Sequence, residues 1–155
     1  MSVGEVLPAP AESGIRCFPI RQYPVLSMEF FAQLTNQVIC VDALAERLTI
    51  SRLPVLCASI DSVLSQSSEN EGEIYCLWGQ FNVARERIRN GVRFTLLNCP
   101  HALAWTVTYH ASTQEVVIHC TIDKREEEEE FVESIQQFMA DWAEGLEAIL
   151  TGKMQ

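Results

Sequence analysis

Residues 73–123 read EIYCLWGQFNVARERI (73–88), RNG (89–91), VRFTLL (92–97), NCP (98–100), HALAWTVTYH (101–110), ASTQ (111–114) and EVVIHCTID (115–123). In this stretch, segments rich in aromatic and β-branched residues alternate with turn-forming residues, which is typical of antiparallel strands. Asn90-Gly91 predicts a two-residue type I′ hairpin turn, because both central positions of that turn need positive φ. The stretch therefore predicts a four-stranded antiparallel β-meander.

The last two predicted strands each have one apolar and one polar face. The apolar positions are Trp105, Val107, Tyr109, Val116, Ile118, Cys120 and Ile122, and the polar positions are Thr106, Thr108, His119 and Thr121. Successive side chains of a strand point to opposite faces, so we expect a helix to cover the apolar face.

The segment after the meander predicts a long amphipathic helix. Its apolar residues recur at helical spacing over nearly six turns: Phe131, Ile135, Phe138, Met139, Trp142, Leu146, Ile149 and Leu150. The preceding acidic run, DKREEEEE (123–130), suits the positive end of the helix dipole. A metal or basic-partner site is the alternative role for the glutamates, although no His or Asp accompanies them at ligand spacing.

The part before the meander is predicted to be extended and then helical. Residues 1–26 contain four prolines, which predict a flexible or extended segment ahead of a single domain over 27–155. Ser27 is a candidate cap for a helix from Met28, with Phe30, Phe31, Leu34 and Val38 at helical spacing. Further short helices are predicted at 42–48 and from Ser51 or Pro54. The whole is an α+β domain: N-terminal short helices, a four-stranded meander and a C-terminal helix packed on the sheet.

Composition and charge exclude several classes of protein. The net charge of -10 argues against general affinity for nucleic acid or anionic membranes, and no apolar run approaches the ~20 residues of a membrane span. The N-terminus lacks the features of a secretory signal, so a cytoplasmic location is expected. The six cysteines lie far apart without a C-x-x-C pair, which predicts reduced, inert thiols and no metal or cofactor.

Three alternating arginines form the first candidate site. Arg85, Arg87 and Arg89 project from one face of a strand, and Arg93, expected opposite Ile88, joins the other face. Aligned guanidiniums can bind a carboxylate or phosphate through their planar forks. The alternative is a solvated strand, or pairing within the chain.

The histidines offer weaker candidates. Cys99 and His101 would form a nucleophile and base, but they are separated by one proline and no third group orients them. We expect a tight turn there instead. His110 and His119 are a candidate metal pair, but a weak one without a carboxylate or thiolate.

Residues 41–64, VDALAERLTISRLPVLCASIDSVL, resemble a helix-turn-helix of bacterial winged-helix regulators. That resemblance implies a recognition helix at 51–65 in the DNA major groove. This helix offers only Arg52 as a basic side chain, whereas base readout needs Arg, Lys, Asn or Gln. Nucleic acid is therefore not the expected partner.

The expected architecture resembles that of lipid-binding helix-grip domains, and the small, acidic α+β chain is similar to type III secretion chaperones. Neither resemblance rests on a sequence motif, so no family is assigned. The leading expectation is a non-enzymatic, homodimeric binding protein for a protein partner or an apolar ligand. The alternatives are the regulator and a small-molecule enzyme or anion-binding pocket protein. In the latter, Arg85, Arg87 or Arg89 would hold an anionic group beside Trp78, Trp105, Tyr109 and His119.

Overall fold

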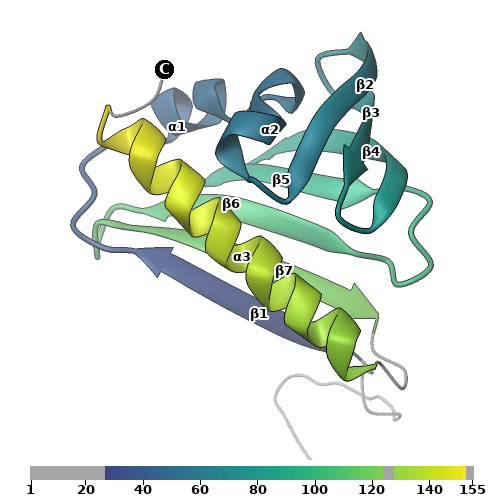
Figure 1. Ribbon diagram of the computed structural model, residues 1–155. Coiled ribbons are helices and arrows are strands. Elements are labelled where there is room, and N and C mark those ends of the chain that lie inside the picture. Colours follow the sequence, from purple (N-terminus) through teal and green to yellow (C-terminus); the bar gives the residue numbers. More distant parts are fainter. Residues whose placement is uncertain (1–26, 124–127, 153–155) are drawn as a thin grey trace, which may run out of the picture.

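A computed structural model gives the chain one antiparallel sheet with a long helix across it (Figure 1). It describes residues 27–123 and 128–152, so the predicted segment over 1–26 lies outside the described residues. The elements in chain order are β1 (Ser27–Leu34), α1 (Val41–Arg47), the 3-10 helix η2 (Ile50–Arg52), α2 (Leu53–Leu56), β2 (Ile60–Ser68), β3 (Glu71–Cys76), β4 (Gly79–Ile88), β5 (Gly91–Leu96), β6 (Ala104–His110), β7 (Glu115–Asp123) and α3 (Glu129–Leu150).

The sheet has seven strands in the order β1-β7-β6-β5-β4-β3-β2, not the predicted four. Residues 73–88, predicted as one strand, belong to the hairpin β3–β4, in which Cys76 pairs with Gly79. Gly79 has a φ of 117°, a conformation that glycine adopts without steric cost. The α+β class and the C-terminal helix are confirmed.

The first predicted helix is wrong and the third is correct only in its first part, because the edge strands β1 and β2 take up residues that were predicted to be helical. Residues 28–38 form β1, which pairs antiparallel with β7, and Val38 lies beyond it and is exposed. The third predicted helix stops after Leu56, and Ile60 begins β2. The helix predicted at 42–48 is confirmed as α1.

The β4–β5 turn differs from the prediction by one residue. Ile88 pairs with Gly91, so Arg89 and Asn90 make the turn, and neither of them has a positive φ. Gly91 is needed for another reason: a β-carbon there would lie 1.9 Å from the carbonyl oxygen of Val107 on β6. Arg93 consequently faces Glu86 across the strands instead of Ile88.

The long helix covers the apolar side of the sheet as expected. Its buried residues are Ile135, Phe138, Met139, Trp142, Leu146 and Ile149. In β6 and β7 the seven positions predicted to be apolar are buried and the polar ones alternate with them. The core lies between these two layers.

The second half of α3 is fixed by contacts with the short helices. A β-carbon at Gly145 would lie 2.0 Å from the carbonyl oxygen of Leu56, so the helix backbones meet there. The Arg47 guanidinium donates to the Ile149 carbonyl (3.1 Å), and the Ser59 hydroxyl donates to Asp141 (2.5 Å). These contacts set the position of α3 over the sheet. In the part of the chain that is described, no helix is long and apolar enough to cross a membrane.

Candidate functional site

The space between α3 and the sheet is filled by large aromatic side chains. Trp105 on β6 lies at the centre, with ring centroids 5.4 Å from Phe94, 5.0 Å from Phe138 and 6.1 Å from Trp142. All four side chains are almost completely buried. Aromatic rings at these separations attract one another beyond the gain from burial alone.

The aromatic layer reaches the surface beside the first turns of α3. Trp78, in the β3–β4 turn, has its ring 5.0 Å from Phe138 and 6.0 Å from Phe131, and its indole N–H donates to the Ser134 hydroxyl (2.8 Å). His101 lies against Phe131 with centroids 4.3 Å apart. The layer therefore runs continuously from a partly exposed rim to a buried centre.

A groove runs along β1 beneath α3, with a volume of about 460 Å³. On the side under α3 it is lined by Phe30, Ala32, Gln136, Met139 and Ala140. Glu29 and Phe31 also line it along the β1 edge, and their side chains contact His119 on the other face of the sheet. Met139 is also part of the buried core, so the groove ends against the interlayer itself. A concave, mainly apolar surface with a few polar groups is typical of a site for a small ligand.

The strand register connects this groove with the centre of the layer. Phe30 pairs with Cys120, and Cys120 pairs with Trp105, so the three residues form one row across β1, β7 and β6 on the face under α3. Two strand spacings, about 10 Å, separate Phe30 from Trp105. The small Cys120 side chain is the only one between the two rings in that row.

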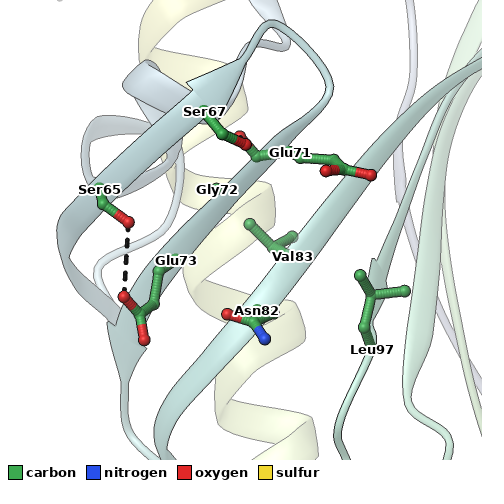
Figure 2. A pocket seen from close by; sticks show the side chains of 8 residues that line it. All are labelled: Ser65, Ser67, Glu71, Gly72, Glu73, Asn82, Val83 and Leu97. Atoms are coloured by element: carbon green, nitrogen blue, oxygen red, sulfur yellow. Dashed lines mark hydrogen bonds between the residues drawn. The ribbon is translucent and has the colours of Figure 1, made fainter.

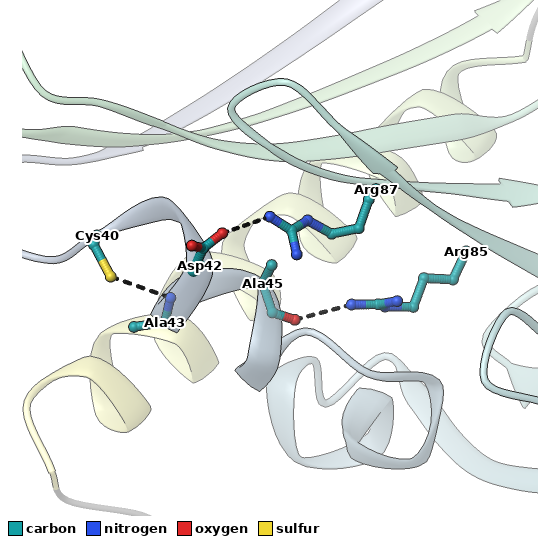
Figure 3. Close-up of polar contacts among 6 residues, drawn as sticks. All are labelled: Cys40, Asp42, Ala43, Ala45, Arg85 and Arg87. Atoms are coloured by element: carbon teal, nitrogen blue, oxygen red, sulfur yellow. Dashed lines mark hydrogen bonds and ion pairs between the residues drawn. The ribbon is translucent and has the colours of Figure 1, made fainter.

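The predicted arginine site is engaged within the chain (Figure 3). The Arg85 guanidinium donates to the carbonyls of Leu48 (2.6 Å) and Ala45 (3.0 Å) at the end of α1, and to the Asn70 side chain (3.3 Å). Arg87 pairs with Asp42 (2.8 Å). A hollow of about 270 Å³ beside the two arginines is also lined by Glu46 and Glu69, whose carboxylates repel an anion. Arg89 lies exposed beyond β4. An anion-binding role for these residues stays a prediction.

The predicted histidine residues lie in different places. His119 accompanies Glu29 (2.7 Å) and stacks on Phe31 (4.4 Å between centroids) on the face turned away from α3, whereas Arg85 and Trp105 lie on the face under α3. His110 contacts Thr108 (3.1 Å). The Tyr109 hydroxyl donates to the Gln37 carbonyl (2.7 Å) and is buried. The enzyme alternative requires an arginine and a histidine to meet in one cleft. Arg85 and His119 lie on opposite faces of the sheet and do not meet this requirement.

The segment 98–101, which holds Cys99 and His101, forms a turn between β5 and β6. Backbone hydrogen bonds from Cys99 to Leu96 and from Ala102 to Cys99 close it, as expected for a tight turn. Among residues 27–123 and 128–152, no group of three His, Cys, Asp or Glu side chains could hold a metal ion.

The three buried cysteines, Cys57, Cys76 and Cys120, have thiols whose pKa is raised by burial. Burial raises the pKa of Cys57 and of Cys120 from 9.0 to about 12, and it also raises the pKa of Cys76. Because the thiolate is the reactive form, these three side chains are unreactive at neutral pH. Cys40 is exposed, and its sulfur accepts from the Ala43 N–H at the start of α1 (3.3 Å).

A second hollow lies on the face of the sheet turned away from α3 and has a polar lining (Figure 2). The Glu73 carboxylate accepts hydrogen bonds there from Gln80 and from the Ser65 hydroxyl (3.4 Å). Glu71, Ser67, Asn82 and Leu97 complete the rim. Because the Glu73 carboxylate already accepts hydrogen bonds from neighbouring side chains, this hollow is a weaker candidate for a ligand site than the groove.

The helix-turn-helix interpretation is wrong. In the segment predicted as a recognition helix, the end of the 3-10 helix η2 is followed by an α-helix of only four residues, Leu53–Leu56, and Leu53 and Leu56 are fully buried. From Ile60 the chain is a strand. No helix is therefore presented at this position for a DNA groove.

Comparisons with known proteins show the fold and no family. No protein-family model and no curated protein matches the sequence. Among solved structures, the chain is similar to a START superfamily protein from Mycobacterium smegmatis, with a TM-score of 0.55, 10% identity, and coverage of 83% of this chain and 99% of that one. It is also similar to the protein XoxI from Bacillus cereus (TM-score 0.57, 11% identity, 83% and 99% covered). A third similar structure is an uncharacterised protein from Bacillus thuringiensis, with a TM-score of 0.50, 11% identity, and coverage of 81% of this chain and 97% of that one.

Sequence reasoning missed the residues that form the groove. The sequence pattern places Phe30 and Ala32 in a helix, and it predicts Met139 only as part of the packed face of α3. The available signal was the alternation of Met28, Phe30, Ala32 and Leu34, which predicts a strand with one inward face. Trp78 and Trp105, which were predicted, both belong to the aromatic layer.

Proposed function

We propose that the protein binds a small apolar ligand in the groove between β1 and α3, without catalysing a reaction on it. The observation that carries this proposal is the groove itself. Its apolar wall, formed by Phe30, Ala32 and Met139, continues into the aromatic layer around Trp105. Transfer of apolar surface from water into such a lining is favourable, by about 25 cal/mol per Å².

The similarity to a START superfamily structure supports the proposal at the level of fold. The same long-helix-on-sheet arrangement occurs in lipid-binding helix-grip domains, which the sequence pattern resembles. Fold alone does not determine function, so the weight of the proposal rests on the chemistry of the groove.

A blocked groove tests the proposal. Ala140 is exposed and lines the groove from α3, so Ala140→Phe adds bulk there without disturbing the core. Glu144→Phe is the matched control, because Glu144 is an exposed residue of the same helix outside the groove. Binding of decane and methyl octyl ketone is measured by tryptophan fluorescence, to which Trp142 on the same helix contributes.

We expect Ala140→Phe to raise the Kd of both probes by at least about tenfold, equivalent to about 1.4 kcal/mol, and Glu144→Phe to leave it within about twofold. Equal binding by the two variants would place the ligand elsewhere. Absence of binding by the unmodified protein would remove the proposed function.

The position of β1 at the edge of the described sheet favours a second candidate, which is self-association. Within the described sheet β1 pairs only with β7, and Phe31 beside that edge is 62% exposed. Unpaired strand edges and exposed aromatic side chains are typical of interaction surfaces. We expect a homodimer in sedimentation velocity, weakened by Phe31→Asp and unaffected by Leu97→Asp, at an exposed residue after β5. A monomer at all concentrations contradicts this candidate.

A further inference from the structure

Two buried hydrogen-bond donors in the aromatic layer have no acceptor within the part of the chain that the structure describes. Among the described residues, the indole N–H groups of Trp105 and Trp142 are fully buried and unpaired. The third tryptophan, Trp78, differs, because its N–H donates to Ser134. Buried polar groups are nearly always paired, and an unpaired one costs free energy.

The position of the two donors relates them to the groove. Trp105 belongs to the row that begins at Phe30 in the groove wall, and Trp142 follows Met139 by three residues on the buried face of α3. The two indole rings are 6.1 Å apart, and both contact Phe94. A chain that enters beside Phe30 and displaces the flexible Met139 side chain would reach both donors.

We propose that the ligand carries an uncharged hydrogen-bond acceptor, of the ketone or ester class, which accepts from the indole N–H of Trp105 and Trp142. An indole N–H only donates, so the complementary group must be an acceptor, and a carbonyl oxygen with two lone pairs can serve both donors. This inference rests on the proposed function and specifies its ligand.

The same surroundings exclude a charged acceptor. No polar or charged residue is among the buried residues of the described core, so no cation accompanies the two tryptophans. An ionised carboxylate without a partner is strongly disfavoured in such surroundings. Decanoate, which carries a carboxylate, should therefore bind more weakly than methyl octyl ketone, although the two molecules have hydrocarbon chains of similar length.

The three tryptophans allow a direct spectroscopic test. Protein labelled with ¹⁵N-tryptophan gives three indole N–H resonances, and the variant Trp78→Phe identifies the resonance of Trp78 without altering the core pair. We expect methyl octyl ketone to shift the two other resonances downfield and to leave that of Trp78 in place. Decane should bind without a downfield shift of any indole proton.

Affinities give a second, independent readout. The ketone should bind at least about tenfold more tightly than decane. Trp142→Phe should lower this preference, because it removes one of the two donors, whereas Trp78→Phe should preserve it. Equal affinities for ketone and decane, with unshifted indole resonances, would overturn this inference and leave the proposed function intact. Water cross-peaks at both indoles that persist in the presence of ketone would overturn it as well. Binding of neither probe would remove the proposed function itself.

Discussion

Gly145 of α3 faces the carbonyl oxygen of Leu56 so closely that a β-carbon at residue 145 would lie 2.0 Å from it. The variant Gly145→Ala must therefore separate α3 from α2, although alanine raises helix propensity by about 1 kcal/mol. We expect the free energy of unfolding in urea to fall by about 2 kcal/mol or more. Glu144→Ala, at the exposed neighbouring residue, should change it by less than about 0.5 kcal/mol. A stabilised Gly145→Ala would contradict the close helix contact.

Arg85 stabilises the fold through the end of α1. Its guanidinium donates to the Ala45 and Leu48 carbonyls, and Arg85→Ala removes the side-chain partner of both. The Ala45 carbonyl keeps the Leu48 N–H as a donor, so the Leu48 carbonyl is the acceptor that loses its partner. We expect a loss of about 1 to 3 kcal/mol in the free energy of unfolding.

Two other arginines are controls for this variant. Arg89→Ala alters an exposed side chain and should be nearly neutral. Arg87→Ala breaks an ion pair whose side chains are 49% and 83% exposed, which is worth about 0 to 1 kcal/mol. If Arg85→Ala were as mild as Arg89→Ala, the contacts with α1 would not contribute to stability.

Gly91 and Asn90 separate two explanations of the β4–β5 turn. A type I′ turn at Asn90-Gly91 would need positive φ at both residues, whereas the structure needs Gly91 for its approach to Val107. We expect Gly91→Ala to destabilise the protein by about 2 kcal/mol or more and Asn90→Ala by less than about 0.5 kcal/mol. Comparable losses in thermal unfolding would favour the turn explanation.

The elements with a long, regular apolar pattern were predictable from the sequence. The alternation in β6 and β7 matches their buried faces residue by residue. The periodicity of α3 matches its buried face except at the two ends, where Phe131 and Leu150 are only partly buried. β1 was misread because Phe31 adds an outward apolar residue to the inward series, which produces helical spacing. β2 was misread because an edge strand with few inward residues lacks a strong alternation, and its bulges interrupt the register.

The site was less predictable than the fold, since it depends on contacts between distant residues. Arg85 donates to carbonyls about 40 positions earlier in the chain. Every residue has a backbone carbonyl, so the sequence does not indicate which carbonyls accept these hydrogen bonds. Trp105 could be placed on the inward face from its parity. Its N–H has no partner among the described residues because Phe94, Phe138 and Trp142 surround the ring, and these three residues come from distant positions in the chain.

Buried thiols make stability depend on pH above neutrality. Cys57 and Cys120 have pKa values raised from 9.0 to about 12, chiefly by burial. The folded protein holds these protons while the unfolded chain releases them, so the stabilisation is complete below pH 9 and is lost as the pH rises to about 12. Each thiol should lower the free energy of unfolding by roughly 1 kcal/mol per pH unit in that window.

Substitutions distinguish the contribution of these thiols to the pH dependence of stability from that of other groups that titrate at alkaline pH. Cys120→Ala should reduce the slope of stability against pH between about 9 and 12, whereas Cys40→Ala, at an exposed residue, should not. At neutral pH we also expect iodoacetamide to label Cys40 and to spare Cys57 and Cys120 in mass-spectrometric mapping. Labelling of Cys120 in the folded protein would show that the interlayer opens readily.

Native mass spectrometry of the protein purified gently from the cells that produce it tests the central claim most directly. We expect the protein chain to carry one small apolar molecule, and we expect Ala140→Phe but not Glu144→Phe to lose it. Fragmentation should identify a ketone or ester carbonyl in it. Ligand-free protein that also fails to bind decane and methyl octyl ketone would contradict the account.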